Sequence, residues 1–376
     1  MANTFQLLID GTSADDALYT ALSSLEVEEN ADLPGAIQLV LPVSRANSGD
    51  LTYVNENRFK PFAHLAVVVT PEGKDAQCIF DGYVLSHKLH LEKGTTASTL
   101  QIWGQDSSWL MNLEEKAKEW VDVTDADVAN AIFKDYGITP ALDNTDDDSP
   151  SHTEDGHSLM QRSSDIQFLR NLARRNGKLC RVVCANQPGQ LTGYFVKPGL
   201  DGDPVIMLKL NDPTTWVVNA LDIDWDVTQP TTVKASQAVF NDDDEDGVSV
   251  GTSDSGLPLL DTQGLADFSG HSKSVLLTTL VDDSGELTLR AQSLLREAGW
   301  FVRCEGETDI ARLNAVLRVG TVVQIESIGK LHSGKYYVWS VRHTITQDAH
   351  KMKFLLVRNA VGSSPSSGGG PLGGLT

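Results

Sequence analysis

Basic residues are scarce in this sequence. Its 376 residues include 30 Lys and Arg against 51 Asp and Glu, which gives a formal net charge of −21 at pH 7. Nucleic acids and anionic lipid surfaces are both bound through clustered Lys and Arg side chains. A chain this acidic is therefore a poor candidate for recognising nucleic acid or for docking on an anionic membrane.

Long hydrophobic runs are also absent. The longest, such as Leu65–Val69, fall far short of the ~20 residues that span a bilayer. The N-terminal segment MANTFQLLID lacks the basic segment and following apolar stretch that mark a secretory signal peptide. We therefore expect a chain that is made in the cytoplasm, without a signal peptide, and that inserts into no membrane.

Cysteine is rare as well. Four cysteines are too few and too scattered for a disulfide framework, so we expect them to be reduced and mostly buried. They are Cys78, Cys180, Cys184 and Cys304. Cys180 and Cys184 fall on the same face of a predicted strand among Leu and Val. Because the C-x-x-C spacing is missing, core packing is favoured over a redox pair.

The sequence does contain a series of short strand patterns. Over residues 1–105, segments rich in Val, Ile, Leu and aromatic residues alternate with turn signals that contain glycine. Short strands at this spacing predict a small barrel or sandwich. In Val84–Leu91 one face is more apolar than the other, which indicates a half-exposed strand.

The hydrophobic period then changes to that of helices. Asp106 is placed to cap a helix whose apolar residues recur over 109–117. Thr124 is placed to cap a second helix, and Gly137 to end it in a left-handed conformation. A later helix is expected over about 286–298, where Leu and Ala recur on one face.

The sharpest helical signal covers residues 163–177. Ser164 and Gln167 have the spacing of a capping box, and apolar residues follow on one side. Arg174 and Arg175 stand near the C-terminal end, where the helix dipole favours cations. Two interpretations stay open for this pair: solvation of the helix end, or contact with another molecule.

These changes of period predict a β-rich α+β fold, with two related small β-barrels and helical insertions. The expected segments are a first barrel (1–105), a helical and mixed α/β insertion (106–190), a β-rich segment continuing into the second barrel (191–240), an acidic connection and helix (241–315), strands of the second barrel (316–360) and a flexible Gly/Ser/Pro tail (361–376).

No convincing catalytic constellation is visible. The stretch GTSDSG at 251–256 resembles a nucleophile elbow only loosely, because its second glycine comes one place too late. His152, Glu154, Asp155 and His157 are of the types that bind metals. They lie in a polar segment without helical spacing or cysteine partners, so a solvated acidic loop is favoured.

A second acidic segment copies the start of a calcium loop. Asp242, Asp244 and Asp246 alternate before Gly247, but Ser253 stands where the twelfth position needs a bidentate carboxylate. Weak divalent binding stays open here beside an acidic loop with no ligand. We predict no catalytic residue, no cofactor and no metal site.

Two stretches of this sequence resemble a known family. IFDGYVLSHKLHL (79–91) and TLQIWGQDSSWL with the residues after it (99–138) look like the first barrel and helical segment of phage tail hub proteins. These include the late control protein D family and the N-terminal part of VgrG spike proteins. The most specific piece, Gln161–Ala173 ending at Gly177, resembles the family's helix, with Ile166 where an aromatic residue commonly stands.

The C-terminal region resembles the family's second barrel. Residues 317–323, 334–338 and 341–343 follow its Gly and G-x-Y-x-V pattern, with Arg318-Val319 where a proline often precedes the glycine. The resemblance covers about residues 1–360. It implies a hub of three copies, whose six related barrels make a pseudo-sixfold ring between a sixfold tail tube and a threefold spike.

The resemblance also implies partners. VgrG proteins continue into an OB-fold and a β-helix needle, whereas this sequence ends in a Gly/Ser/Pro tail, so the spike is expected to be a separate chain. The expected state is a homotrimer that contacts the spike, the inner tube and baseplate wedge proteins in a virion or extracellular particle. We predict edge pairing through Val84–Leu91 and Tyr336–Thr344. The candidate interface residues are Trp103, Tyr337, Arg174 and Arg175.

Two other functions stay open at this point. A cell-wall hydrolase carried by a tail would draw on the residues at 152–157, and a calcium-dependent adhesin on Asp242–Asp246. The sequence does not decide between a phage tail, a type VI system and an extracellular injection particle, although the lack of a fused spike disfavours a conventional type VI protein.

Overall fold

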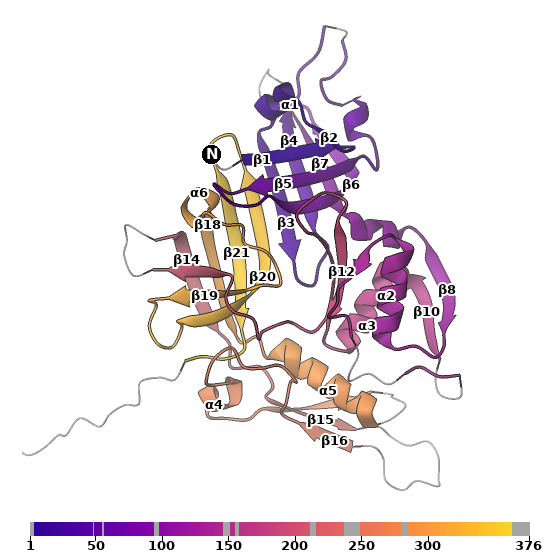
Figure 1. Ribbon diagram of the computed structural model, residues 1–376, viewed down its shortest axis with the longest axis vertical. Coiled ribbons are helices and arrows are strands. Elements are labelled where there is room, and N and C mark those ends of the chain that lie inside the picture. The colour runs from indigo at the N-terminus through magenta and orange to yellow at the C-terminus, as the bar shows by residue number, and fades with distance from the viewer. Residues whose placement is uncertain are drawn as a thin grey trace, which may run out of the picture.

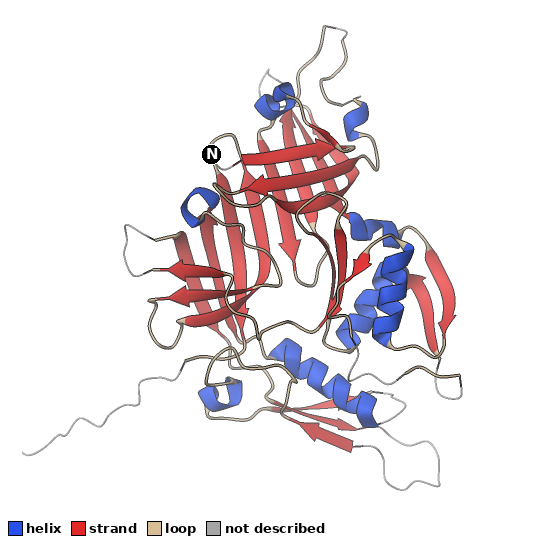
Figure 2. Ribbon diagram, viewed as in Figure 1, coloured by secondary structure: helices blue, strands red, loops and turns tan. Residues whose placement is uncertain are grey.

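The fold is known from a computed structural model, in which strands predominate and helices are few (Figure 2). It describes residues 4–47, 49–54, 56–93, 98–145, 151–154, 158–210, 216–236, 249–279 and 284–362. Thirteen strands form one sheet, in the order β14-β18-β21-β20-β3-β4-β7-β6-β5-β1-β2, with β19 on β20 and β13 on β19.

The first half of this sheet, at the top of Figure 1, is built by residues 4–106. Its strands are antiparallel, and in β7 every second residue from Leu100 to Asp106 is buried whereas those between are partly exposed. The strands are β1 (Thr4–Ile9), β2 (Thr12–Ser13), β3 (Ser24–Asn30), β4 (Ala36–Pro42), β5 (His64–Thr70), β6 (Gln77–His90) and β7 (Thr99–Asp106). Short helices are α1 (Asp16–Ala21) and η1 (Asn57–Phe59).

The second half of the sheet collects strands from the C-terminal part of the chain. Its apolar residues belong to the same large core as those of the first half. The strands are β13 (Ile206–Lys209), β14 (Val218–Trp225), β18 (Val302–Asp309), β19 (Val322–Glu326), β20 (Gly334–Ile345) and β21 (His350–Arg358), with the short helix α6 (Ile310–Leu313) between β18 and β19.

The two halves meet where β20 pairs with β3, a junction called the seam below. Six residue pairs, from Ser340–Asn30 to Ile345–Leu25, form an antiparallel ladder. Leu25, Val27 and Val341 beside it are fully buried. The expected β-rich α+β class with helical insertions is thus confirmed. The described strands trace one continuous sheet, however, and do not close into two separate barrels, because β20 continues the first half's ladder instead of ending at its own barrel.

An inserted α/β unit follows β7 and lies to the right in Figure 1. A second core holds this unit together, in which Phe133 of α2 and Leu169 of α3 are buried with Phe195 of β12. Its elements are η2 (Ser107–Asn112), β8 (Glu115–Trp120), α2 (Asp125–Asp135), β9 (Thr139–Pro140), β10 (Leu159–Ser164), α3 (Asp165–Arg175), β11 (Leu179–Cys184) and β12 (Leu191–Val196).

A small α/β layer lies at the bottom of Figure 1. Helix α5 (Ser284–Ala298) covers a three-stranded sheet through Leu287, Ala291 and Leu295. The sheet consists of β15 (Thr232–Ser236), β16 (Ser249–Thr252) and β17 (Ser274–Thr278), and α4 (Leu265–Ser269) lies between β16 and β17. The helix expected over about 286–298 is therefore confirmed.

The segment 191–240, expected to continue into the second barrel, divides among three sheets. β12 forms a hairpin with β11 in the inserted unit, because their residues pair from Leu179–Val196 to Cys184–Leu191. β13 and β14 join the large sheet, whereas β15 joins the layer under α5. Of the expected tail, only residues 361 and 362 are among the described ones.

Of the predicted helix caps, some are confirmed and others differ in the structure. Thr124 and Asp127 form a capping box at α2, and Gly137 has a positive φ of 68°, as predicted. Asp106 does cap a helix, but a single 3₁₀ segment, after which residues 115–120 pair as β8 with β10. Ser164 begins α3 without a side-chain cap, since its hydroxyl donates instead to Asn112 at 2.6 Å.

Candidate assembly interface

The predicted strand edge at Val84–Leu91 exists. β6 pairs with β7 along its whole C-terminal half, but β5 begins only at His64, opposite Tyr83. The segment before β5 adds two bonds at Val84, from the Phe62 N–H to the Val84 carbonyl and from the Val84 N–H to the Ala63 carbonyl. Beyond Val84, no described strand pairs with this edge of β6. Ser86, Lys88 and His90 are exposed there, on the outer face of the sheet.

The second predicted edge, Tyr336–Thr344, was wrong. β20 has partners on both sides, with β21 along one edge and β19 followed by β3 along the other. An exposed edge needs free N–H and C=O groups, and here both sets are used within the chain. The strand's role is therefore to join the two halves.

Sequence reasoning missed a different edge, that of β14. Among the described strands, β14 ends the large sheet and pairs with β18 alone. Asp222 and Asp224 are exposed on it, and Trp225 is 49% exposed. The alternation of Leu221 and Ile223 with these aspartates was the available signal.

The two aromatic candidates occupy different environments. Trp103 lies half-buried on the outer face of β7, opposite Ser86 of β6. Tyr337 is 1% exposed and stacks on Trp300 with ring centroids 5.8 Å apart. Trp103 is thus accessible to a partner beside the open edge of β6, whereas Tyr337 packs inside the chain. Their assignment to an interface stays a prediction.

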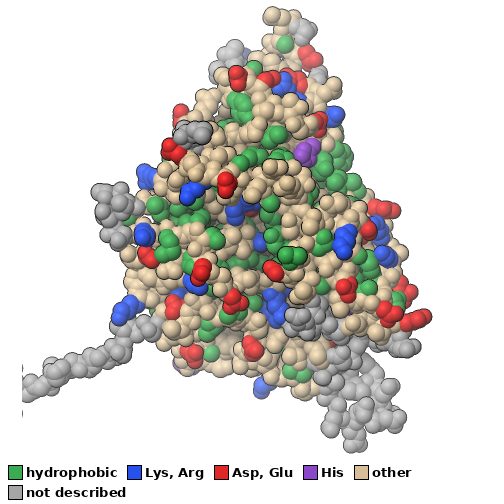
Figure 3. Space-filling view, viewed as in Figure 1, with side chains coloured by type: hydrophobic (Ala, Val, Ile, Leu, Met, Phe, Trp, Pro, Cys, Tyr) green, Lys and Arg blue, Asp and Glu red, His purple; other side chains and the backbone are tan. Residues whose placement is uncertain are grey.

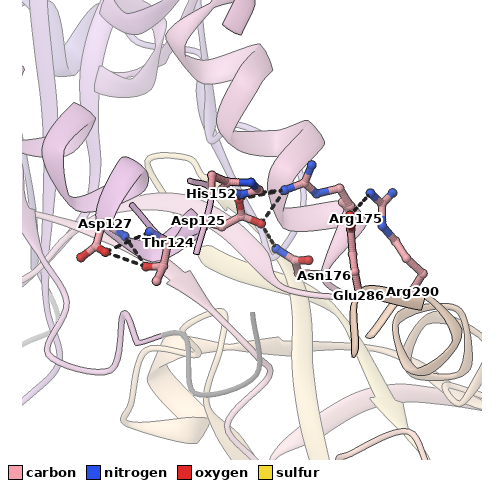
Figure 4. A network of polar contacts seen from close by, with 8 residues as sticks. All are labelled: Thr124, Asp125, Asp127, His152, Arg175, Asn176, Glu286 and Arg290. Carbon is pink, nitrogen blue, oxygen red and sulfur yellow. Dashed lines mark hydrogen bonds and ion pairs between the residues drawn. The ribbon is translucent and has the colours of Figure 1, made fainter. Parts of the chain in front are cut away.

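Arg175 belongs to a network inside the inserted unit (Figure 4). Its Nη2 donates to both carboxylate oxygens of Asp125, at 2.8 and 2.9 Å. His152 Nε2 lies 2.8 Å from the same carboxylate, and the amide of Asn176 donates to it as well. The network joins the start of α2 to the end of α3 and to the segment that carries His152.

The carboxylate of Asp125 at the centre of this network stays ionised down to low pH. Burial alone would raise the pKa of Asp125, but the His152 hydrogen bond and the Arg175 charge outweigh it and lower that pKa to about 2. The side chain of Asp125 is fully buried. Of the two arginines, Arg175 is thus used within the fold. Arg174 is exposed, with its Nη2 3.5 Å from Asp32, and remains free for a partner on most of its surface.

A third arginine, which sequence reasoning missed, attaches α5 to the inserted unit. Arg296 is 3% exposed and donates to the carbonyl oxygens of Asn176 at 2.7 Å and Ser255 at 2.6 Å. The hydroxyl of Ser293 donates to the Arg174 carbonyl at 2.8 Å. These donors satisfy carbonyls at the end of α3, which a helix leaves unpaired.

A second polar group lies at the seam. His343 is fully buried, and its Nδ1 lies 3.0 Å from Nε2 of His350. Its Nε2 lies 3.5 Å from Glu29, which also accepts from Arg318 Nε at 3.0 Å. Burial, together with the His343 ring, lowers the pKa of His350 to about 3.

Those residues considered for catalysis or metal binding that the structure describes do not form a cluster. His152 is held by Asp125, and Glu154 is exposed. Asp155 and His157 lie outside the described residues, as do Asp242, Asp244, Asp246 and Gly247. Ser253 is exposed in the loop after β16. Among the described helices, none is long and apolar enough to cross a membrane.

Known structures share this architecture. The 43 kDa tail protein of prophage MuSo2 from Shewanella oneidensis aligns with a TM-score of 0.67 and 14% identity, over 96% of this chain and 100% of that one. The tail protein from Neisseria meningitidis MC58 gives 0.65 and 12%, over 96% and 97%. An Escherichia coli component of the type VI secretion system gives 0.56 and 11%, over 96% and 79%. The fold is therefore that of tail hub proteins, as the sequence resemblance implied.

The sequence comparisons add one assignment. No curated protein matches the chain. One family model, described as the Alg8 N-terminal domain, matches residues 1–347. This match covers most of the chain, and the chain therefore belongs to the Alg8 N-terminal domain family.

Proposed function

We propose that this chain is a structural hub protein in the baseplate of a contractile tail or injection system. In this role it joins a sixfold inner tube to a threefold spike made by a separate chain. The observation that carries the proposal is the fold likeness to a prophage tail protein over 96% of this chain and 100% of the other. The seam supports it, because it fixes two β-rich halves rigidly within each subunit, as a pseudo-sixfold ring of three chains needs.

The ring contact is proposed to run between the open edge of β6 on one subunit and β14 on the next. A head-to-tail contact between two different surfaces closes a ring when the rotation allows it. The outer face of the β6 edge carries Lys88 and His90, and the outer face of β14 carries Asp222 and Asp224. Opposite charges on paired strands stabilise the pair by roughly 0.2–1 kcal/mol each.

The apolar sides of the two edges also match. Leu89 on β6 and Leu221 and Ile223 on β14 are partly buried and pack toward the core side of the sheet. Pairing the edges would extend that core across the subunit boundary and satisfy two rows of backbone groups. Trp103 lies beside the β6 edge and is the proposed aromatic anchor, and the exposed Arg174 is a further candidate contact.

The native mass across a concentration series, for the chain alone and with its candidate spike protein, tests this proposal. We expect three chains in at least one condition. Lys88→Glu places like charges together and should weaken assembly about fivefold per interface, if the pair contributes ~1 kcal/mol. A double variant that carries both Lys88→Glu and Asp222→Lys should restore assembly. Lys93→Glu, an exposed lysine beyond the strand, is the matched control.

Strict monomers in both conditions would overturn the ring. Assembly that is insensitive to Lys88→Glu, but lost in Trp103→Ala, would keep the hub and move the contact away from the β6 edge. No described contact favours the hydrolase or the adhesin. A zymogram with a clear zone that Glu154→Ala abolishes would support the hydrolase, and a rise in melting temperature with millimolar calcium would support the adhesin.

A further inference from the structure

Two thiols and a carboxylate from distant parts of the chain meet where the inserted unit touches the first half of the sheet. Cys78 and Asp81 lie on β6, and Cys184 ends β11. All three side chains are buried, and one potential ligand atom from each lies within 4.8 Å of the other two. The other two cysteines of the chain, Cys180 and Cys304, lie in different clusters.

Backbone contacts bring these residues together. The N–H of Cys78 donates to the Ala185 carbonyl at 3.0 Å, which fixes the end of β11 against β6. Ala66 and Val68 cover the two sulfurs with apolar surface. Cys78 Sγ donates to the Phe80 carbonyl and Cys184 Sγ to the Gln187 carbonyl, both weak bonds at 3.2 Å. The two thiols also contact each other.

Hydrogen bonds from three other residues orient the carboxylate of Asp81. Its Oδ1 accepts from Ser107 at 3.0 Å and lies 2.9 Å from Nε2 of His64. Its Oδ2 accepts from the N–H of Gly189 at 2.8 Å and from no other group among the residues that the structure describes. A carboxylate that binds a metal is commonly held by such outer partners, which leave a lone pair for the cation.

We propose that Cys78, Asp81 and Cys184 bind a zinc-like divalent cation through two thiolates and one carboxylate oxygen. Tetrahedral zinc with bond lengths of about 2.0–2.3 Å sets its ligand atoms roughly 3.3–3.8 Å apart. The present upper limit of 4.8 Å is within about 1.5 Å of that arrangement, so small side-chain rotations close it. Thiolate ligands select zinc over magnesium or calcium.

The surroundings leave room for a water and hold groups that would balance the charge. A cavity of about 40 Å³, lined by Asp81 and Cys184 among other residues, is large enough for one water, which would serve as the fourth ligand. Binding would release the two thiol protons to solvent, leaving three anionic ligands around a dication. The guanidinium of Arg318, which donates to the Cys184 carbonyl at 3.0 Å, and His64 lie beside them.

Such a cation would clamp the inserted unit to the sheet. Its ligands come from the large sheet and from the inserted unit, so only the folded chain brings them together. Because the cation would bind the folded chain and not the unfolded one, binding would raise the free energy of unfolding. The site depends on contacts within one chain and does not rest on the ring proposed above.

The test is metal binding by the full chain, purified reduced and without chelator. We expect about one zinc per chain by elemental analysis, and uptake of Co²⁺ with a thiolate charge-transfer band that Zn²⁺ removes. Cys78→Ser and Cys184→Ser should each lose the band. Cys180→Ser, which changes another buried thiol of β11, should keep it. Asp81→Asn should keep the band and weaken Co²⁺ binding at least tenfold.

The wild-type chain alone can overturn the proposal, so it does not depend on the variants folding. Four reactive thiols in denaturant, with no bound metal and no cobalt band, would contradict it. Two missing thiols without metal would indicate a Cys78–Cys184 disulfide instead and would also contradict it. A band that persists in both serine variants would place the cation elsewhere.

Discussion

Two junctions hold this molecule together, and they are built from different interactions. At the seam, β20 and β3 share a backbone ladder flanked by Leu25, Val27 and Val341, which are fully buried. The inserted unit has an apolar core of its own, and charged side chains, among them Asp125, Arg175 and Arg296, also join its segments to one another and to α5. A backbone ladder tolerates most substitutions on its exposed face, whereas a buried ion pair fails when one partner is removed.

The two junctions should differ in how strongly a change of charge destabilises them. The seam carries a buried polar cluster beside an apolar core: His343 contacts His350 and Glu29, and Glu29 also accepts from Arg318. The inserted unit carries a carboxylate, that of Asp125, which is the shared acceptor of three polar side chains. We therefore expect single-residue charge changes to damage the inserted unit most, and mild acid to damage the seam first.

The largest expected effect is that of Asp125→Ala. It leaves Arg175, His152 and Asn176 without their shared acceptor, and removal of one partner from a buried ion pair costs about 3–5 kcal/mol. Urea unfolding at pH 7 measures this cost. The control is Asp127→Ala, two residues along the same helix, which loses only a capping contact worth roughly 1 kcal/mol. Equal costs for the two variants would show that the network is not the main tie.

A moderate effect is expected from mild acid at the seam. His350 has a pKa of about 3 when folded and an ordinary value of 6.5, so the unfolded chain takes up the proton first as the pH falls. Stability should drop by about 2 kcal/mol between pH 6.5 and 5, at 1.4 kcal/mol per pH step. Asp125 contributes stability above pH 3.8 that is lost only as the pH falls through about 2, so its network stays intact in this range.

His350→Gln isolates the seam in urea unfolding between pH 7 and pH 4.5. The variant should lose less stability on acidification than the wild type. His64 acts in the opposite direction, because its hydrogen bond to Asp81 raises its pKa, so its stabilisation is present below pH 6.5 and is lost as the pH rises through the folded value. The difference between the wild type and His350→Gln removes that common contribution. Parallel pH curves would contradict the assignment to His350.

The smallest effect on stability is expected from Arg174→Ala. Its side chain is 65% exposed and its contact with Asp32 is long, so unfolding should change by no more than about 0.5 kcal/mol. Because Arg174 is also a proposed partner contact, the same variant should raise the concentration needed for assembly. Urea unfolding measures the stability of the variant, and its native mass over a concentration series measures assembly. A loss of stability with unchanged assembly would contradict the assignment of Arg174 to a partner contact.

Local signals explain what the sequence could predict. The α2 cap at Thr124 and Asp127 and the half-exposed end of β6 depend on neighbours a few residues away, and both were predicted. β3 was missed, although Leu25 and Val27 alternate with glutamates, because its charged residues outnumber its apolar ones. Residues 109–117 follow a helical period, but 115–117 belong to β8, since pairing with β10 outweighed the local pattern.

Long-range contacts explain the rest. Cys78 and Cys184 were separated by the whole inserted unit, so spacing paired Cys184 with Cys180 instead. Arg175 was expected at the surface or at an interface, because nothing near it in the sequence announces Asp125 as its partner. Similarly, the pattern of β20 predicted a strand but not the partner on its second edge. Register with remote strands is set by the packed core, which local periodicity does not contain.

Amide hydrogen exchange on the assembled and monomeric chain tests the central claim most directly. If β6 and β14 of neighbouring subunits pair, the amides of Leu85–His90 and of Val218–Trp225 should exchange markedly more slowly in the assembled state, alone or with the spike. Amides of the seam, from Ser340 to Ile345, should be protected in both states because their partners lie within one chain. Unchanged exchange at both edges, with new protection elsewhere, would contradict the proposed ring contact.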